Sequence, residues 1–183
     1  NGGGNPTSNA PLRGKKGTTW EGGFRVPCLM RWPGRIAAGS TCRAVTSAMD
    51  FYPTLAALGG AELPRDRIID GKDIRPLIFS GGKGESLYEA FFYYMSNRLH
   101  AVRRGQWKLH VAKKTGQGYE ETHELYDLEA DVGESNNLYD QHPAIVAELE
   151  ALLHACREDL GDEVAGVRGH NVRPIGRVDY PQT

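Results

Sequence analysis

The sequence has few cysteines, almost no net charge and no long hydrophobic run. Its three cysteines, Cys28, Cys42 and Cys156, are widely spaced and form no C-x-x-C pair. A structural zinc site or a disulfide framework is therefore not expected, and the redox compartment stays open. The formal net charge of −1 gives no electrostatic reason to expect nucleic acid or a membrane surface as a partner. No apolar run approaches the roughly 20 residues that span a bilayer.

The beginning of the chain has neither an initiator methionine nor a signal peptide. Residues 1–19 are rich in Gly, Asn, Ser and Thr and show no hydrophobic period, which predicts a loop. We therefore expect a fragment of a longer protein that begins inside a loop.

The next part of the chain predicts pieces of an α/β domain. Residues 24–33 form a continuous apolar run closed by Pro33-Gly34, typical of a strand buried on both faces of a parallel sheet. Residues 50–60 predict a short helix, and residues 74–79 predict a helical turn.

The second half changes character and predicts a small α+β layer. Four runs, residues 88–95, 99–103, 106–112 and 124–128, indicate antiparallel strands, with a hairpin turn at Arg104-Gly105. Residues 140–159 predict an amphipathic helix that starts near Pro143 and stops at Gly161. Its expected apolar face consists of Ile145, Leu149, Leu152, Leu153, Cys156 and Leu160. The predicted boundary near residue 82 separates residues 1–82 from residues 83–183, which end in an irregular tail.

Residues 13–25 are the segment most suited to chemistry. Lys15, Lys16, Thr18 and Thr19 lie among glycines, and such a loop can offer ammonium and N–H donors to a tetrahedral oxyanion. The spacing does not fit the GxxxxGK[ST] phosphate loop of nucleotide-binding proteins. By composition alone, the alternative is an ordinary solvated turn.

A family resemblance runs through most of the chain. Residues 14–27, GKKGTTWEGGFRVP, are similar to the segment G-K-G-T-x-[WY]-E-G-G-x-R-x-P of the arylsulfatases. Six further landmarks follow in the family's order, at residues 32–34, 50–55, 70–73, 101–108, 124–128 and 133–138. The chain thus resembles the C-terminal portion of a type I sulfatase.

The resemblance implies a fold and a reaction. Residues 1–82 would be an incomplete piece of an alkaline-phosphatase-like α/β domain, followed by a four-stranded antiparallel sheet packed by one helix. A formylglycine hydrate would attack sulfur, the alcohol would leave, and sulfate would be eliminated. None of the three cysteines lies in the family's [CS]-x-P-x-R motif. The nucleophile and most ligands of the implied calcium ion are therefore expected upstream, so the chain alone should be inactive. A periplasmic or secreted location is implied as well.

The resemblance also suggests roles for particular residues. Lys16 matches the lysine that contacts the sulfate and its bridging oxygen, where an ammonium stabilises the charge that grows as the S–O bond breaks. Asn1 matches the end of the D-N-G segment that ligates calcium. Asn97 and Arg98, in a short connection between two strands, are expected at the rim of the substrate pocket, and His123 is a further candidate for substrate binding. Lys15 is interpreted as a surface residue.

Other polar residues have structural interpretations. Glu21 and Arg25 are expected to pair or to satisfy loop amides, and residues 127–137 are expected to form a turn and not a calcium loop. The expected partner is a sulfate-ester small molecule or a sulfated glycan. Two alternatives stay open: a related metal-dependent phosphatase, phosphonate hydrolase or phosphodiesterase, and a non-catalytic accessory domain.

Overall fold

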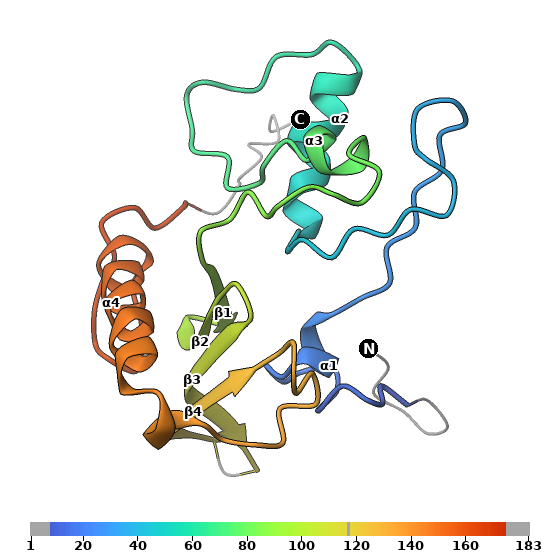
Figure 1. The fold of residues 1–183 in the computed structure, drawn as a ribbon. Coiled ribbons are helices and arrows are strands. Elements are labelled where there is room, and N and C mark those ends of the chain that lie inside the picture. The colour runs from blue at the N-terminus through green and yellow to red at the C-terminus, as the bar shows by residue number, and fades with distance from the viewer. Residues whose placement is uncertain (1–7, 117, 175–183) are drawn as a thin grey trace. The chain divides into compact units, whose positions relative to one another are not determined.

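The computed structural model describes residues 8–116 and 118–174 and divides the chain into two compact units. The sheet unit comprises residues 1–24 and 92–183, and the helical unit comprises residues 25–91. Figure 1 shows the elements of each. The domain boundary predicted near residue 82 follows a different criterion, namely similarity to a larger domain, and stays a prediction. No helix among the described residues is long and apolar enough to cross a membrane.

The sheet unit contains a four-stranded antiparallel meander. Strands β1 (Phe91–Met95), β2 (Arg98–Arg104), β3 (Trp107–Thr115) and β4 (Gly118–Asp127) are neighbours in chain order. The pairing of Arg104 with Trp107 leaves the two-residue turn Gly105-Gln106, one residue later than the predicted turn at Arg104-Gly105. The four predicted strands are confirmed, and β4 begins earlier than its apolar residues indicated.

Helix α4 (Pro143–Leu160) packs against β2 and β3 on one face of this sheet. Its buried side chains are Val146, Leu149, Leu153 and Cys156. Proline at the first position and glycine at the stop are confirmed. Of the predicted stripe, Leu149, Leu153 and Cys156 are buried, whereas Ile145, Leu152 and Leu160 are half-buried. Val146 is buried and was missing from the prediction. Because 3.6 residues make a turn, Val146 lies in phase with Leu149 and Leu153, and Ile145 lies at the edge of their stripe.

The two faces of the sheet are covered differently. Val102 pairs with Leu109 across β2 and β3, and both side chains are fully buried. The next pair, Arg103 and Lys108, points to the opposite face because side chains alternate along a strand. On that face, Lys108 meets the Thr19 carbonyl oxygen and Glu21, the first residue of the one-turn helix α1 (Glu21–Phe24). A short 3-10 helix, η2 (Tyr139–Gln141), leads into α4.

The helical unit is built from η1 (Ala48–Asp50), α2 (Phe51–Leu58) and α3 (Arg75–Ile78). Both predicted helices are confirmed. The carboxylate of Asp50, which is fully buried, accepts hydrogen bonds from the Ser47 and Lys72 amides at 2.7 Å each and from the Tyr88 hydroxyl. This one side chain ties together three segments of the unit.

The strand predicted at residues 24–33 is wrong for this structure. Residues 25–33 form no regular element up to the turn at Pro33, and Leu29 is 92% exposed. A strand buried on both faces needs hydrogen-bonded neighbours, and the described residues of the helical unit contain no strand that could pair with it. No strand among the described residues pairs with this apolar run.

Candidate functional site

Lys16 lies at the tip of a β-turn in the segment that the sequence singled out. The Thr18 amide donates to the Lys15 carbonyl oxygen at 3.1 Å, and the Thr18 hydroxyl donates to the same oxygen at 2.8 Å. Gly17 has φ +86°, which suits the third position of a type II turn. Lys16 therefore occupies the second position, where its side chain is exposed.

The segment around this turn closes on itself; we call residues 13–24 the lysine loop. The Gly22 amide donates to the Arg13 carbonyl oxygen at 2.8 Å. A Cβ at Gly22 would lie 2.6 Å from the carbonyl oxygens of Arg13 and Gly14, so only glycine allows this approach. The Asn9 side-chain amide donates to the carbonyl oxygens of Gly14 and Gly22 at 3.0 and 3.2 Å. The loop's two ends are thus held side by side.

Beneath the lysine loop lies a buried ion cluster of Glu21, Lys108, His110 and Glu134. All four side chains are at most 1% exposed. The Lys108 ammonium contacts Glu21 Oε1 at 2.8 Å, Glu134 Oε1 at 2.9 Å and the Thr19 carbonyl oxygen at 2.8 Å. These three acceptors match its three N–H donors. A buried ammonium without such partners would be very costly, so the cluster depends on complete pairing.

Arginines extend the cluster toward the surface. The Arg103 guanidinium lies 3.6 Å from Glu21 Oε2, so two cations face two carboxylates. Arg13 stacks on Trp20 at 3.7 Å and donates to the Glu134 carbonyl oxygen at 2.8 Å and to the Tyr126 hydroxyl at 3.2 Å. The Glu21 amide donates to Glu134 Oε2 at 2.7 Å. Glu134 therefore holds both ends of the lysine loop.

His110 is the neutral member of the cluster. Burial, the largest influence, and the nearby Lys108 charge lower the pKa of His110 to about 4, although the Glu134 carboxylate opposes that shift. A neutral imidazole has one N–H, and Nε2 lies 2.9 Å from Glu134 Oε1, so the proton is assigned to Nε2. Nδ1 is buried and has no hydrogen-bond partner among the described residues.

Of the predicted site residues, Lys16, the adjacent Asn97 and Arg98, and His123 lie on three separate segments of the sheet unit. Within residues 8–116 and 118–174, no hydrogen bond or ion pair joins Lys16 to the other three. Asn1, the predicted calcium ligand, lies outside the described residues. His123 is exposed, and its ring packs edge-on against Tyr139 at 5.4 Å.

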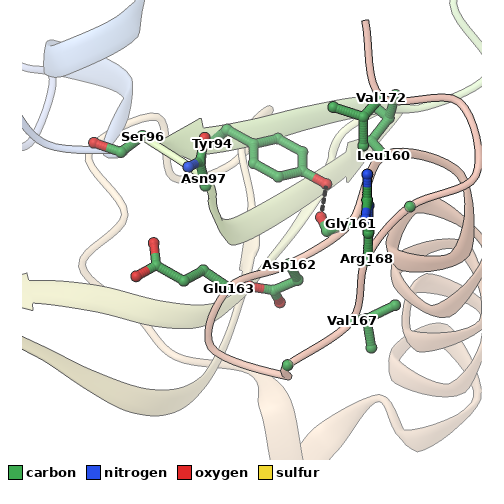
Figure 2. A pocket seen from close by; sticks show the side chains of 12 residues that line it. Tyr94, Ser96, Asn97, Leu160, Gly161, Asp162, Glu163, Val167, Arg168 and Val172 are labelled. Carbon is green, nitrogen blue, oxygen red and sulfur yellow. Dashed lines mark hydrogen bonds between the residues drawn. The ribbon is translucent and has the colours of Figure 1, made fainter. Parts of the chain in front are cut away.

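Asn97 lines a shallow pocket of about 600 Å³ between the β1–β2 turn and the turn that follows α4, and Arg98 is the next residue but does not line it. Figure 2 shows Ser96 and Asn97 on one side of it and Asp162 and Glu163 on the other. Arg98 is the first residue of β2; its guanidinium pairs with Glu163 at 3.2 Å and stacks over Tyr119 at 4.1 Å. The Asn97 side chain is exposed. The connection is thus the two residues Ser96-Asn97, one residue shorter than predicted.

Glu21 is buried and pairs with Lys108 and Arg103, which supports the structural role expected of it. Its expected pairing with Arg25 stays a prediction. Asp131 accepts hydrogen bonds from the Ser135 and Asn136 amides at 2.6 and 2.8 Å, as a turn-forming side chain does. No group of three or more His, Cys, Asp or Glu residues in the described part of the chain could hold a metal ion.

Sequence reasoning did not find Lys108, His110 and Glu134. Because side chains alternate along residues 106–112, Lys108 and His110 point to the face of the strand away from Leu109, and such a polar face is ordinarily exposed to solvent. One helix can cover only one face of a sheet, and two polar loops cover the other here. The sequence did contain a hint of this cluster: Lys108, which ends the landmark at residues 101–108, and His110 lie two residues apart in the predicted strand 106–112 and therefore share one face.

The α+β fold and the glycine-bounded lysine loop agree with the C-terminal region of sulfatases, and comparison with known proteins shows that membership. The family model described as "N-sulphoglucosamine sulphohydrolase, C-terminal" matches residues 15–159. The chain belongs to this family.

Individual relatives agree. Steryl-sulfatase from Mus musculus is 36% identical over 84% of this chain and 29% of its own length. The PsFucS1 sulfatase from Pseudoalteromonas sp. superposes with a TM-score of 0.70 at 26% identity, over 79% of this chain and 32% of that one. BT4656, solved in complex with its substrate D-glucosamine-2-N,6-O-disulfate, gives a TM-score of 0.54 at 28% identity, over 69% and 27%. The chain therefore spans roughly a third of the length of these proteins.

Proposed function

We propose that this chain supplies the leaving-group side of the active site in a sulfuric ester hydrolase, with Lys16 as the residue that touches the sulfate. The observation that carries the proposal is the presentation of Lys16: an exposed ammonium at the tip of a turn whose ends are anchored to a buried ion cluster. Such a group can neutralise charge on the bridging oxygen as the S–O bond breaks, without reorganising at that moment.

The nucleophile and the metal come from elsewhere in this proposal. The described residues contain neither a formylglycine motif nor a set of side chains that fits calcium. We therefore assign no chemical step to either group here. In a complete enzyme, formylglycine would supply the attacking oxygen, and the isolated chain should not turn over sulfate esters.

The substrate proposed is a sulfate ester of a small molecule or a sugar. BT4656 takes a disulfated glucosamine as its substrate, which supports the sugar class for a related chain. The neighbourhood of Asn97 would then contact the part of the substrate that leaves as the alcohol.

The helical unit is proposed to be the end of the larger α/β domain. Its exposed apolar side chains include Val26 at 63%, Leu29 at 92% and Leu55 at 63%. Isolated exposed apolar residues are ordinary, but several on one short unit suggest a surface that packs on further protein. The relatives are about three times as long as the chain and could supply that protein.

The test uses a complete sulfatase polypeptide that carries residues 1–183 and a chromogenic aryl sulfate. Lys16→Ala should lower kcat by ~10²–10³-fold, the scale for losing one oxyanion donor, and leave the fold intact. Lys15→Ala is the matched control, because Lys15 is an exposed lysine one residue away, and it should retain wild-type turnover. Equal turnover by the Lys16 variant would remove Lys16 from the reaction. Hydrolysis of an aryl phosphate but not of the sulfate would overturn the function itself.

A further inference from the structure

The buried ion cluster has no direct part in the chemistry proposed above. Its members are at most 1% exposed, so no substrate can reach them. Pairs of this kind are also poor sources of stability, because well-packed apolar residues in their place are often as stable or more so. A cluster that costs desolvation and gains little stability calls for another explanation, and its contacts indicate one.

We propose that Glu134 and Lys108 are positioning residues that fix the lysine loop and thereby set where Lys16 meets the sulfate ester. This inference rests on the proposed function and adds to it the part of the protein that organises the site. The cluster acts on the backbone of the loop and not on the Lys16 side chain.

The loop is gripped on both sides of Lys16. On the C-terminal side, Lys108 binds the Thr19 carbonyl oxygen, and Glu134 Oε2 accepts from the Glu21 amide. On the N-terminal side, the Glu134 carbonyl oxygen accepts from the Arg13 guanidinium. Lys16 lies midway between Arg13 and Thr19, so neither end of its turn can shift without breaking a charge-assisted hydrogen bond.

Charge-assisted bonds suit this task because they are short and directional. The bonds that hold the loop measure 2.7–2.8 Å at the Glu21 amide, the Thr19 carbonyl and the Arg13 guanidinium. Apolar packing tolerates sliding, whereas a saturated ammonium between two carboxylates has one arrangement. A displacement of about 1 Å at a catalytic group can cost on the order of a hundredfold in rate, so fixed placement has kinetic value.

The decisive variant is Glu134→Gln, which keeps the side chain's shape and one acceptor oxygen but removes its charge. In the complete sulfatase polypeptide, we expect kcat to fall about tenfold and KM to change less than about twofold, since Lys16 acts on the transition state. Amide hydrogen exchange should accelerate in residues 13–24 and stay unchanged in β3.

A double-mutant cycle separates positioning from general damage. If Glu134 acts through Lys16, Glu134→Gln should lower kcat less than about twofold once Lys16→Ala is present. A further tenfold loss in that background would overturn the proposal, as would lost stability with unchanged kcat. Asp50→Asn is the matched control, because it makes the same change at a fully buried carboxylate of the helical unit. It should lower stability without coupling to Lys16.

A variant that does not fold and a wild type without sulfatase activity each require a different experiment. If Glu134→Gln does not fold, Arg13→Gln replaces it in the same cycle, because Arg13 is partly exposed and its loss leaves the buried charges paired. If the wild type hydrolyses no sulfate ester, the proposed function has failed. The exchange experiment then still decides whether the cluster fixes the loop: unchanged exchange in residues 13–24 of the Glu134 variant refutes positioning.

Discussion

The sheet unit and the helical unit are stabilised in opposite ways. Nearly all fully buried apolar side chains belong to the sheet unit, among them Leu99, Val102, Leu109, Leu125 and Leu149. In the helical unit, the buried apolar residues are Pro53, Ile74 and Leu77, and the carboxylate of Asp50 is fully buried. The sheet unit thus has an apolar core of its own, and the helical unit is held largely by hydrogen bonds.

The difference extends to charge. The sheet unit buries paired ions beneath the lysine loop, and the apolar core on the other face of the sheet offsets the cost of removing those ions from water. The helical unit exposes several large apolar side chains, among them Leu29 and Leu55. The apolar core of the sheet unit can stabilise a fold that also buries paired charges. We expect the helical unit to need contact with neighbouring protein for comparable stability. The following experiments test that contrast.

The largest effect is expected for Lys108→Met, which removes the only ammonium of the buried ion cluster. Glu21 and Glu134 would then face each other without a shared cation, and breaking a buried pair costs about 3–5 kcal/mol. Urea unfolding of residues 1–183, followed by circular dichroism, measures it. The triple variant with Glu21→Gln and Glu134→Gln should recover much of the loss. A decrease in the free energy of unfolding of less than about 1 kcal/mol would mean that the stability of the sheet unit does not depend on the cluster.

The second experiment compares the two units within one sample by amide hydrogen exchange. We expect amides of α2 to exchange at least a hundredfold faster than those of β3, about 2.7 kcal/mol, because α2 exposes Phe51, Tyr52 and Leu55. In a complete sulfatase polypeptide, the α2 amides should gain protection while β3 changes little. Equal exchange in the isolated chain would show that the helical unit is independently stable.

The elements that the sequence predicted well are those with a local periodic signal. Alternation revealed the strands, and the stripe through Leu149 and Leu153 revealed α4, with Pro143 and Gly161 as its ends. The strand at residues 24–33 failed because burial depends on partners, and periodicity does not say whether the partners are present. The error at Ile145 was one of helical phase.

The candidate site was predicted only in its exposed part. Lys16 was predicted because its motif is contiguous and resembles a known family, and its role stays a prediction. The buried ion cluster joins residues 21, 108, 110 and 134, which are far apart in sequence. Charged residues are rarely fully buried, so sequence reasoning places each of them at the surface by default. Only the fold shows that two polar loops and one strand face enclose them.

The third experiment uses pH. The pKa of His110 is lowered from 6.5 to about 4, so the unfolded chain binds the additional proton between these values. Stability should therefore fall as pH decreases from about 6.5 toward 4, with His110 contributing about 2 kcal/mol of the loss at pH ~5. His110→Gln should lose less stability between pH ~7 and ~5 than the wild type, as measured by urea unfolding. Taking the difference between the two proteins removes the titration of carboxylates that both contain. Parallel curves would contradict a neutral, buried His110.

The smallest effect is expected at the pocket of Figure 2, on the surface of the sheet unit. Asn97 has an exposed side chain, whereas Arg98 is held by Glu163 and Tyr119. Asn97→Ala therefore removes a polar group without disturbing packing, and Arg98→Ala removes an ion pair and a stacking contact as well. If this rim contacts the alcohol portion of the substrate, Asn97→Ala should change discrimination between substrates and not the sulfate chemistry.

In a complete sulfatase polypeptide, kcat/KM for a bulky sulfated sugar should fall about three- to tenfold in Asn97→Ala and Arg98→Ala, with a small aryl sulfate unaffected. Such a ratio corresponds to about 1 kcal/mol, the scale of one exposed hydrogen bond. Asn136→Ala, the same truncation at another exposed turn, should leave kcat/KM unchanged for both substrates. If both substrates decline together, the turn supports the fold. If neither changes, the pocket lies away from the substrate, and the proposed chemistry of the sheet unit is confined to the lysine loop.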